Sequence, residues 1–406
     1  MEESQKICNP LISVVIPVYN RQKVIGRLLE ALEQQTYSNI EIVCVDDGSK
    51  DETQHIVQKH MDKDARIILK IKENGGAVSA VCMGIRETRG KYICFVDSDD
   101  IIGRDYIQNY VDQLDKEYDF IAFGFYYKDG ICKKPYYLKE TRIYVREQLD
   151  IYRDQVLIEH NNSNISNRFF ISRWNKMYSK ECVLKILPEY EKCIGLVLGE
   201  DTVFNHLLIR YARNGKTIQK PNSYFYDISD SESSVMRDTN YIKYIKSCEK
   251  AYMVFESILK EDGFSNRQAL YIVYYHISSI FSRLFLQNTK KFDAMYEELK
   301  KNKLYICALK QFKSDTQSRK QKIMIEMQLV APTGLFYREI LKNVKKIKKF
   351  KNSVQNAVRF IIKNLNQYGM RKTLINWKYQ RRRLHANEDL KRELPKLEKR
   401  IRPIIE

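Results

Sequence analysis

The feature that most constrains the fold is an alternation of two hydrophobic patterns over the first hundred residues. Short runs rich in β-branched and apolar residues predict buried strands at 12–18, 40–45, 66–71 and 92–96. Between them, apolar residues that recur every three or four positions predict helices at 24–35, 51–61 and 78–88. Strands separated by helices are joined by right-handed crossovers and form a mostly parallel sheet. We therefore predict an α/β fold in which a Rossmann-like, mostly parallel sheet is flanked by helices.

The pattern changes after residue 118. An extended segment at 118–127 leads to a turn at Asp129-Gly130, a helix is expected at 199–215, and 217–229 is again extended. Beyond Asn240 the hydrophobic periodicity is almost entirely helical. The sequence therefore predicts a C-terminal α-helical extension that follows the α/β part.

Carboxylates gather where two of the predicted strands end. Asp46 and Asp47 follow the second strand, and the sequence Asp97-Ser98-Asp99-Asp100 follows the fourth. In open α/β sheets, ligands bind at the carboxyl ends of the strands. Two carboxylates there offer hard oxygen ligands to Mg²⁺ or Mn²⁺, and such ions keep positions open for substrate phosphates. The alternative is a solvated acidic turn, because Asp is a standard turn residue.

Two other short segments have the same ambiguity. The segment "GED" (199–201) lies at the start of a predicted helix, where Glu200 and Asp201 would be favoured by the helix dipole or could act as a general base. The segment "ENGGAVSA" (73–80) is a glycine-rich bend that can bring backbone close to a ligand. It matches neither of the two common phosphate-loop patterns.

Taken in order, five segments resemble one family. The segments "LISVVIPVYNR", "IEIVCVDDGSKDET", "ENGGAVSAVCMGIRETRGKYICFVDSDD", "RWNKMYSKECVL" and "GEDTVFNHLLI" are similar to the family-2 glycosyltransferases. These are inverting enzymes of the GT-A fold that are common in bacterial capsule, exopolysaccharide and cell-wall assembly. The resemblance covers residues 11–235, and the ordered combination is far more specific than any single segment.

The resemblance implies a donor site for a UDP-sugar with Mn²⁺ or Mg²⁺. Asp47 would face the uracil, Asp99 would be the direct metal ligand, and Asp97 would lie nearer the ribose or a metal-bound water. A divalent cation there would neutralise the diphosphate as it leaves. The remaining residues expected to bind the donor are Pro17, Val18, Tyr19, Asn20, Asn74, Gly76 and Ser98.

The resemblance also implies a base and an acceptor side. Asp201 matches the second acid of the family's Glu-Asp motif, which is the usual catalytic base, and Glu200 is the fallback. Trp174, Asn175 and Lys176 match a segment that borders the acceptor, which we expect to be a glycan or a lipid-linked saccharide. Trp174 would stack on a sugar face, or else it is a core residue, since tryptophan is largely buried in most proteins.

On this basis we expect four parts. They are a nucleotide-sugar-binding half (1–110), an acceptor-binding half (111–238), a helical region (239–336) and a basic amphipathic tail (337–406).

The sequence departs from the family pattern in two places. Val81 and Cys82 replace a usual Arg-Asn pair, and Asp227 and Ser229 replace basic residues near the end of the catalytic region. Arg237 is a candidate substitute phosphate contact. These departures motivate a second hypothesis, a catalytically silent glycosyltransferase-like scaffold or binding protein at the membrane.

The net charge of +19 is concentrated in the tail. Residues 338–406 carry 21 basic and 6 acidic side chains, which leaves the rest of the chain nearly balanced. Apolar residues at a helical spacing from Tyr337 to Leu365, flanked by lysines, are typical of a helix on an anionic membrane surface, although a helix packed on the catalytic part has the same pattern. We expect no nucleic-acid partner, because no recognisable binding module accompanies the charge.

Three further observations bear on the compartment. The nine cysteines are dispersed without C-x-x-C pairs, which fits a reducing compartment. The N-terminus has no basic region followed by an apolar one, and no run approaches 18 uncharged apolar residues. We therefore expect a cytoplasmic protein that is peripheral on the inner face of the cell membrane.

Overall fold

The computed structural model describes residues 9–138, 140–150, 153, 172–227, 241–287, 289–316, 319–331 and 334. The chain divides into two compact units, Met1–Ile272 and Val273–Glu406. The predicted basic tail (337–406) and Arg237 lie outside the described residues.

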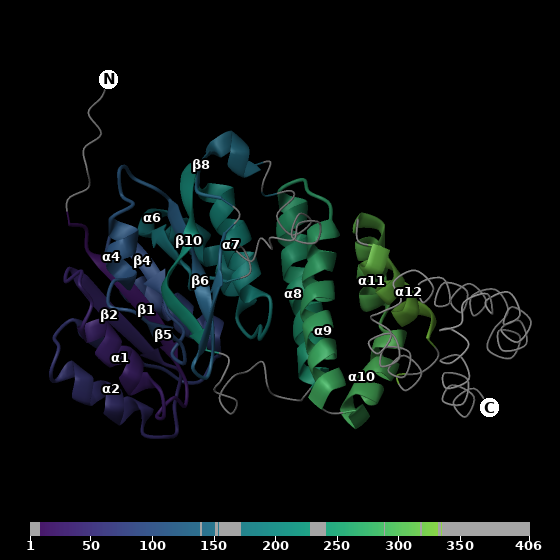
Figure 1. The fold of residues 1–406 in the computed structure, drawn as a ribbon, viewed down its shortest axis with the longest axis horizontal. Coiled ribbons are helices and arrows are strands. Elements are labelled where there is room, and N and C mark those ends of the chain that lie inside the picture. The colour runs from purple at the N-terminus through teal and green to yellow at the C-terminus, as the bar shows by residue number, and fades with distance from the viewer. Residues whose placement is uncertain are drawn as a thin grey trace, which may run out of the picture. The chain divides into compact units, whose positions relative to one another are not determined.

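In the described residues, the first unit is built on one sheet of ten strands (Figure 1). Eight of these strands lie in the order β3-β2-β1-β4-β9-β6-β10-β5. Strand β7 pairs with β6, and β8 pairs with β10. The strands are β1 (Ile12–Val18), β2 (Ile40–Asp46), β3 (Ile67–Ile71), β4 (Tyr92–Phe95), β5 (Ile101–Ile102), β6 (Phe120–Asp129), β7 (Cys132–Tyr136), β8 (Arg142–Val145), β9 (Lys176–Ser179) and β10 (Asn214–Asp227).

Helices connect these strands and cover the sheet. They are α1 (Ile25–Glu33), α2 (Thr53–Met61), α3 (Ala77–Glu87), α4 (Tyr106–Val111), α6 (Lys180–Tyr190), the short 3₁₀ turn η2 (Glu191–Cys193) and α7 (Glu200–Tyr211). The sheet is buried on both faces. Val14 and Ile16 of β1 belong to the core that α1, α2 and α4 cover. Val15 lies on the other face against α3, where a Cβ at Gly84 would be 2.4 Å from its side chain. A glycine at this position therefore allows α3 to approach the sheet closely.

The predicted parallel sheet is found in the first half, and the second half makes the sheet mixed. Strands β3, β2, β1 and β4 pair in parallel, whereas β9 pairs antiparallel with both β4 and β6. Strand β10 is parallel to β6 and antiparallel to β5. Because β9 runs against β4, its first residue, Lys176, lies beside the end of β4. The end of β10 lies beside β5 for the same reason, so both segments reach the edge where β1, β2 and β4 end.

The helical extension begins with α8 (Tyr241–Glu261) and continues with α9 (Arg267–Gln287), α10 (Thr289–Lys301), α11 (Lys303–Asp315) and α12 (Arg319–Val330), which confirms the helical pattern predicted beyond Asn240. Within the second unit, Tyr274 stacks on Phe312 with ring centroids 3.8 Å apart. Among the helices described, none has both the length and the apolarity needed to span a bilayer.

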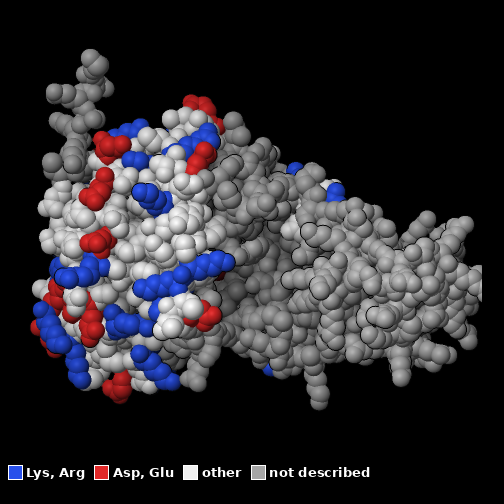
Figure 2. All heavy atoms as spheres, in the orientation of Figure 1, with Lys and Arg blue, Asp and Glu red and all other residues white. Residues whose placement is uncertain are grey.

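Charge on the described surface is mixed in sign. On the face of the first unit that Figure 2 presents, acidic and basic side chains lie next to one another. This mixture agrees with the nearly balanced charge of the chain outside the basic tail.

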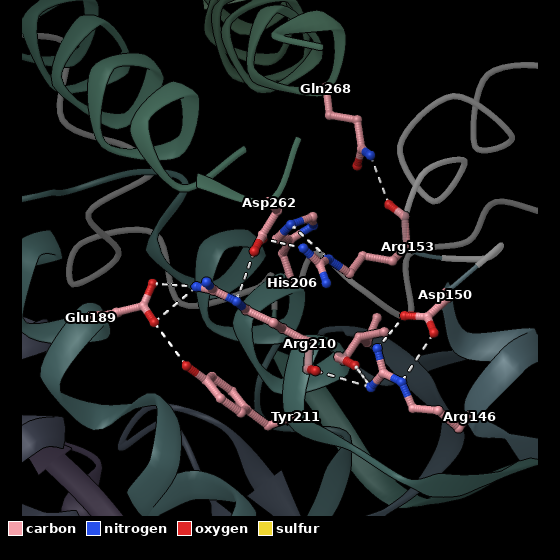
Figure 3. Close-up of polar contacts among 10 residues, drawn as sticks. Arg146, Asp150, Arg153, Glu189, His206, Arg210, Tyr211, Asp262 and Gln268 are labelled. Carbon is pink, nitrogen blue, oxygen red and sulfur yellow. Dashed lines mark hydrogen bonds and ion pairs between the residues drawn. The ribbon is translucent and has the colours of Figure 1, made fainter. Parts of the chain in front are cut away.

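A buried ion network surrounds the C-terminal half of α7 (Figure 3). The Asp262 carboxylate pairs with Arg153 and, at 2.8 Å, with Arg210, whose guanidinium also lies 2.7 Å from Glu189. Gln268 donates to the backbone carbonyl of Arg153 at 2.7 Å. These contacts join helices α6 and α7 to the end of α8 and the start of α9.

Two features fix α7 further. Arg146 donates to the carbonyl oxygens of Ile209, Arg210 and Ala212 at 2.9, 3.0 and 2.7 Å, and so satisfies groups that the end of a helix leaves unpaired. His206 accepts from Arg153 Nε at 3.4 Å and lies edge-on to Phe255. Burial, together with the charges of Arg153 and Arg210, holds the pKa of His206 well below 6.5.

We expect the stability of the protein to fall as the pH drops below about 6.5, and His206 to account for part of the loss. His206 stays neutral in the folded protein but takes up a proton in the unfolded chain, so its contribution is present above pH 6.5 and is lost as the pH falls toward its depressed folded pKa. The measurement is the urea midpoint between pH 5 and 8 for wild type and His206→Gln. Parallel pH profiles for the two proteins would contradict this prediction.

Candidate active site

Carboxylates from two distant segments meet at the edge where β4 ends. Asp97 and Asp99 follow β4, and Glu200 and Asp201 are the first residues of α7. Burial, followed by the charges of Asp201 and Asp99, raises the pKa of Asp97 to about 7, while Arg173 acts in the opposite direction. Burial and the charge of Asp201 raise the pKa of Glu200 to about 7. The four carboxylates therefore share one electrostatic environment.

Asp100 is the buried member of the acidic turn. Its carboxylate accepts from the Tyr224 hydroxyl at 2.5 Å and from the Asp227 amide at 3.0 Å, and these contacts tie the turn to the end of β10. Burial and the charges of Asp97 and Asp99 raise the pKa of Asp100. Ser98 is buried in the same turn. Asp100 thus supports the turn from which Asp97 and Asp99 project.

The chemistry of this turn fits a divalent cation. Bringing several carboxylates together in a partly buried place raises their proton affinity, and a cation bound there relieves the same repulsion. Within the described ranges, no three His, Cys, Asp or Glu side chains are arranged to hold a metal without help. Mg²⁺ is typically bound by one or two carboxylates together with substrate phosphates. Asp97 and Asp99 would therefore suffice as the protein ligands of such a site.

Asp201 is held by an arginine that the sequence analysis did not select. The Arg173 guanidinium lies 2.7 Å from Asp201 Oδ1, and the Arg173 amide donates to Oδ2 at 3.2 Å. Arg173 also donates to the Tyr190 hydroxyl at 2.7 Å. Burial alone would lower the pKa of Arg173, but Asp201, Tyr190 and the nearby carboxylates raise it overall. Arg173 therefore stays charged and fixes the direction of the Asp201 carboxylate.

The three residues next to Arg173 are buried. Trp174 is 7% exposed and stacks on Tyr224 and Tyr226, with ring centroids 4.5 and 5.4 Å away. Asn175 donates to the Phe123 carbonyl at 3.0 Å, and Lys176 donates to the Asn175 side-chain oxygen at 2.7 Å.

In this structure the three predicted acceptor residues make contacts within the protein, and their role toward an acceptor stays a prediction. Burial lowers the pKa of Lys176. Trp174 lies in the core, which is the alternative that its sequence left open. The Lys176 amine also donates to the Ser172 carbonyl at 2.5 Å.

Asp47 lies at the same edge of the sheet, two strands away from Asp97. Its carboxylate accepts from Lys72 Nζ at 2.7 Å and from the amides of Gly75 and Gly76 at 2.9 and 2.7 Å. The Asn74 side chain donates to the Asp47 carbonyl at 3.0 Å. Asp47 therefore shapes the glycine-rich bend, and Gly76, with φ of +85°, adopts a conformation that favours glycine.

The β1–α1 turn completes this part of the edge. Pro17 and Val18 end β1 beside the end of β2. Tyr19 is 43% exposed, and Asn20 has φ of +51°. The Asn20 side-chain oxygen accepts from the Lys50 amide at 2.8 Å, while its own amide donates to Ser49 at 2.9 Å. The structure thus places the expected donor residues along one edge, but Asp47 has its polar contacts with the bend rather than with the acidic turn.

Four charged residues outside the predicted site also lie at this edge. Arg21 Nη2 is 3.7 Å from Asp99 Oδ2, and Arg27 Nη2 donates to the Asp99 carbonyl at 3.1 Å. Asp227, at the end of β10, pairs with Lys128 at 2.9 Å and with Arg27 at 3.8 Å. Although Arg21 ends a quoted motif segment and Asp227 was noted as a departure, the sequence names no partner for any of the four, so only the fold reveals the contacts.

A family model covers most of the residues that lie at this edge. Residues 13–183 match the model described as glycosyl transferase family 2. The match contains β1 from its second residue, the glycine-rich bend, the acidic turn and Arg173, and it ends before Glu200 and Asp201.

Several bacterial proteins are similar in sequence. The chain is 30% identical over 215 residues to "Uncharacterized glycosyltransferase EpsJ" of Bacillus subtilis, which covers 52% of this chain and 59% of that protein. It is 32% identical over 196 residues to "Glycosyltransferase GlyA" of Streptococcus pneumoniae, which covers 48% of this chain and 27% of that protein. The chain spans about half the length of the first relatives that it matches.

Solved structures show the same fold. S. aureus TarS 1-349 in complex with UDP has a TM-score of 0.54 and 18% identity, over 84% of this chain and 93% of that one. The UDP-GlcNAc complex of the same protein has a TM-score of 0.51 and 19% identity, over 86% and 91%. At this level of identity the likeness concerns the fold alone, and it confirms the GT-A fold expected from the sequence.

Proposed function

Residues 13–183 belong to glycosyl transferase family 2, and from this premise we propose that the protein is an inverting glycosyltransferase. It transfers a hexose or N-acetylhexosamine from a UDP-sugar to a glycan acceptor, which we propose to be lipid-linked, in the synthesis of a bacterial surface polysaccharide. One observation carries this proposal. Carboxylates from two segments a hundred residues apart lie at one edge of the sheet, where burial and the charges of Asp201, Asp99 and Glu200 raise the pKa of Asp97 to about 7.

Each carboxylate pair has a separate role in the proposed reaction. Asp97 and Asp99 would hold Mn²⁺ or Mg²⁺, which supplies neutralising charge to the diphosphate when it is bound. Asp201 accepts a proton from the attacking acceptor hydroxyl, and Arg173 holds its carboxylate in one orientation for that transfer. The complexes of TarS with UDP and UDP-GlcNAc support the choice of a uridine nucleotide.

The proposed location is the inner face of the cell membrane. The basic tail would bind anionic lipids there, with each Lys or Arg near the surface contributing about 1 kcal/mol. A lipid-linked acceptor would then be close to the catalytic edge. Vesicle co-sedimentation of the full chain, with anionic and with neutral lipids, tests this part of the proposal separately.

The second candidate function is a scaffold without turnover. It is favoured by the burial in α3 of the two residues, Val81 and Cys82, that replace the family's usual Arg-Asn pair. Val81 and Cys82 are 0% and 1% exposed. At these positions α3 therefore offers no polar side chain to a donor. UDP release with a mixed panel of donors and acceptors separates the candidates, because a scaffold would release none.

Binding of the donor nucleotide gives the most direct test. We expect UDP with Mn²⁺ to raise the melting temperature by several degrees, since saturation at one hundred times Kd stabilises a protein by about 2.7 kcal/mol. The Asp99→Ala variant should lose this response. The matched control is Asp112→Ala, which removes an exposed carboxylate immediately after α4. An undiminished response of Asp99→Ala would contradict the proposed metal ligand, and a panel of UDP- and GDP-sugars then identifies the donor.

A further inference from the structure

Asp227 is a buried carboxylate with two cationic partners from other parts of the fold. Its side chain is 2% exposed, whereas those of Lys128 and Arg27 are 21% and 44% exposed. Lys128 lies opposite Asp227 in the register of β6 and β10, and Arg27 reaches it from α1. A carboxylate buried to this extent needs compensating charge. The carboxylate is therefore shielded from water, and its two cations are not.

Arg27 also connects this ion cluster to the proposed metal site. Its guanidinium donates to the carbonyl of Asp99 at 3.1 Å while one of its nitrogens lies 3.8 Å from Asp227 Oδ2. The Asp227 amide in turn donates to Asp100 in the same acidic turn, at 3.0 Å. Arg27 is thus fixed beside a residue that would hold a diphosphate-bound cation, and Lys128 is connected to the same turn through Asp227.

We propose that Arg27 and Lys128 bind the diphosphate of the donor nucleotide, and that Asp227 holds them in place when no nucleotide is present. This inference rests on the proposed function and names the cations that this particular chain uses. A guanidinium pairs well with phosphate oxygens because its nitrogens form a planar fork of donors. On donor binding, both side chains exchange part of their contact with Asp227 for phosphate oxygens. They then stabilise the negative charge that grows on the diphosphate as the sugar leaves.

The arrangement gives a physical meaning to the acidic residue at position 227. The family pattern has a basic residue at this position, and Arg237 was a candidate substitute for it. In the fold, positive charge reaches the same place from α1 and β6 instead. Asp227 keeps the two cations from repelling each other, and it orders them before the ligand arrives.

The test compares uridine, UMP and UDP as ligands of the full-length protein in the presence of Mn²⁺, by isothermal titration calorimetry. For Arg27→Gln and Lys128→Gln we expect the affinity for UDP to fall about tenfold each, because a charged hydrogen bond contributes roughly this much, while the affinity for uridine is unchanged. Arg86→Gln is the matched control. Arg86 lies in the last turn of α3, at the opposite edge of the sheet. Its side chain has a similar exposure, 51%, and pairs with Glu191.

The ligand series separates the possible outcomes. An equal loss for uridine and UDP, or no loss for UDP, overturns this inference while the proposed function stands. A wild-type protein that binds none of the three ligands overturns the proposed function itself. Asp227→Asn provides an independent measurement. It removes the charge that orders Arg27 and Lys128 with little change of shape, so we expect the affinity for UDP to fall severalfold, and an unchanged or higher affinity would contradict the role given to Asp227.

Discussion

The Asp201→Asn variant is expected to lose between about 10² and 10⁴ in kcat while it still binds UDP with Mn²⁺, because general base catalysis contributes about this much. Asparagine keeps the shape of the side chain but cannot take the proton of an acceptor hydroxyl. The measurement is UDP release under saturating donor, together with the thermal response to UDP and Mn²⁺. A variant that retains near-normal transfer would show that Asp201 is not the base.

Two controls make this result specific. Replacing Asp201 leaves Arg173 buried without its carboxylate, so the melting temperature of the variant must be measured alongside its activity. Glu200→Gln is the neighbouring comparison. Burial and the charge of Asp201 raise the pKa of Glu200 to about 7, a value that suits a general base. A large loss in Glu200→Gln with a small one in Asp201→Asn would exchange the two roles.

The largest effect on stability is expected for Asp262→Ala. This change leaves Arg153 and Arg210 without the carboxylate that they share, and removing one partner of a buried ion pair costs about 3–5 kcal/mol. Asp262 is 7% exposed and Arg153 is equally buried, so water cannot easily replace the lost partner. Urea unfolding followed by circular dichroism measures the change in the free energy of unfolding.

Figure 3 contains the matched control. Asp150 pairs with Arg146 on the same side of the molecule, but its side chain is 51% exposed. Exposed pairs at this spacing contribute about 0.3–0.5 kcal/mol, so Asp150→Ala should be nearly neutral. Equal losses for the two variants would mean that burial does not control the energy of this network.

The strands and helices of the first hundred residues could be predicted because each one buries its own hydrophobic pattern. Strand β1 has the predicted bounds, and α3 differs from its prediction by one residue at each end. The antiparallel strand β9 could not be predicted in this way. It has only four residues, with one lysine among them, and it is a strand because β4 and β6 lie on either side of it. Tertiary contacts, rather than local pattern, define it.

The candidate site divides in the same manner. The acidic turn and the Glu-Asp pair were singled out from their positions at a strand end and a helix start, the family resemblance gave them roles, and the structure brings them together. Arg173 was missed although it precedes Trp174. Nothing in the sequence around an arginine followed by an aromatic residue indicates that it pairs with Asp201. Arg27 and Lys128 were missed for a simpler reason. Their partner, Asp227, lies about 200 and 99 residues away in the sequence.

The network around α7 also sets a limit on how far the protein can be shortened. Glu200 and Asp201 begin this helix, and its other end depends on Asp262 and, through Arg153, on Gln268. A truncation at residue 238 would keep every residue assigned to chemistry and yet remove the anchors of the helix that carries two of them. A fragment intended for activity assays or crystallisation should therefore end well beyond Gln268.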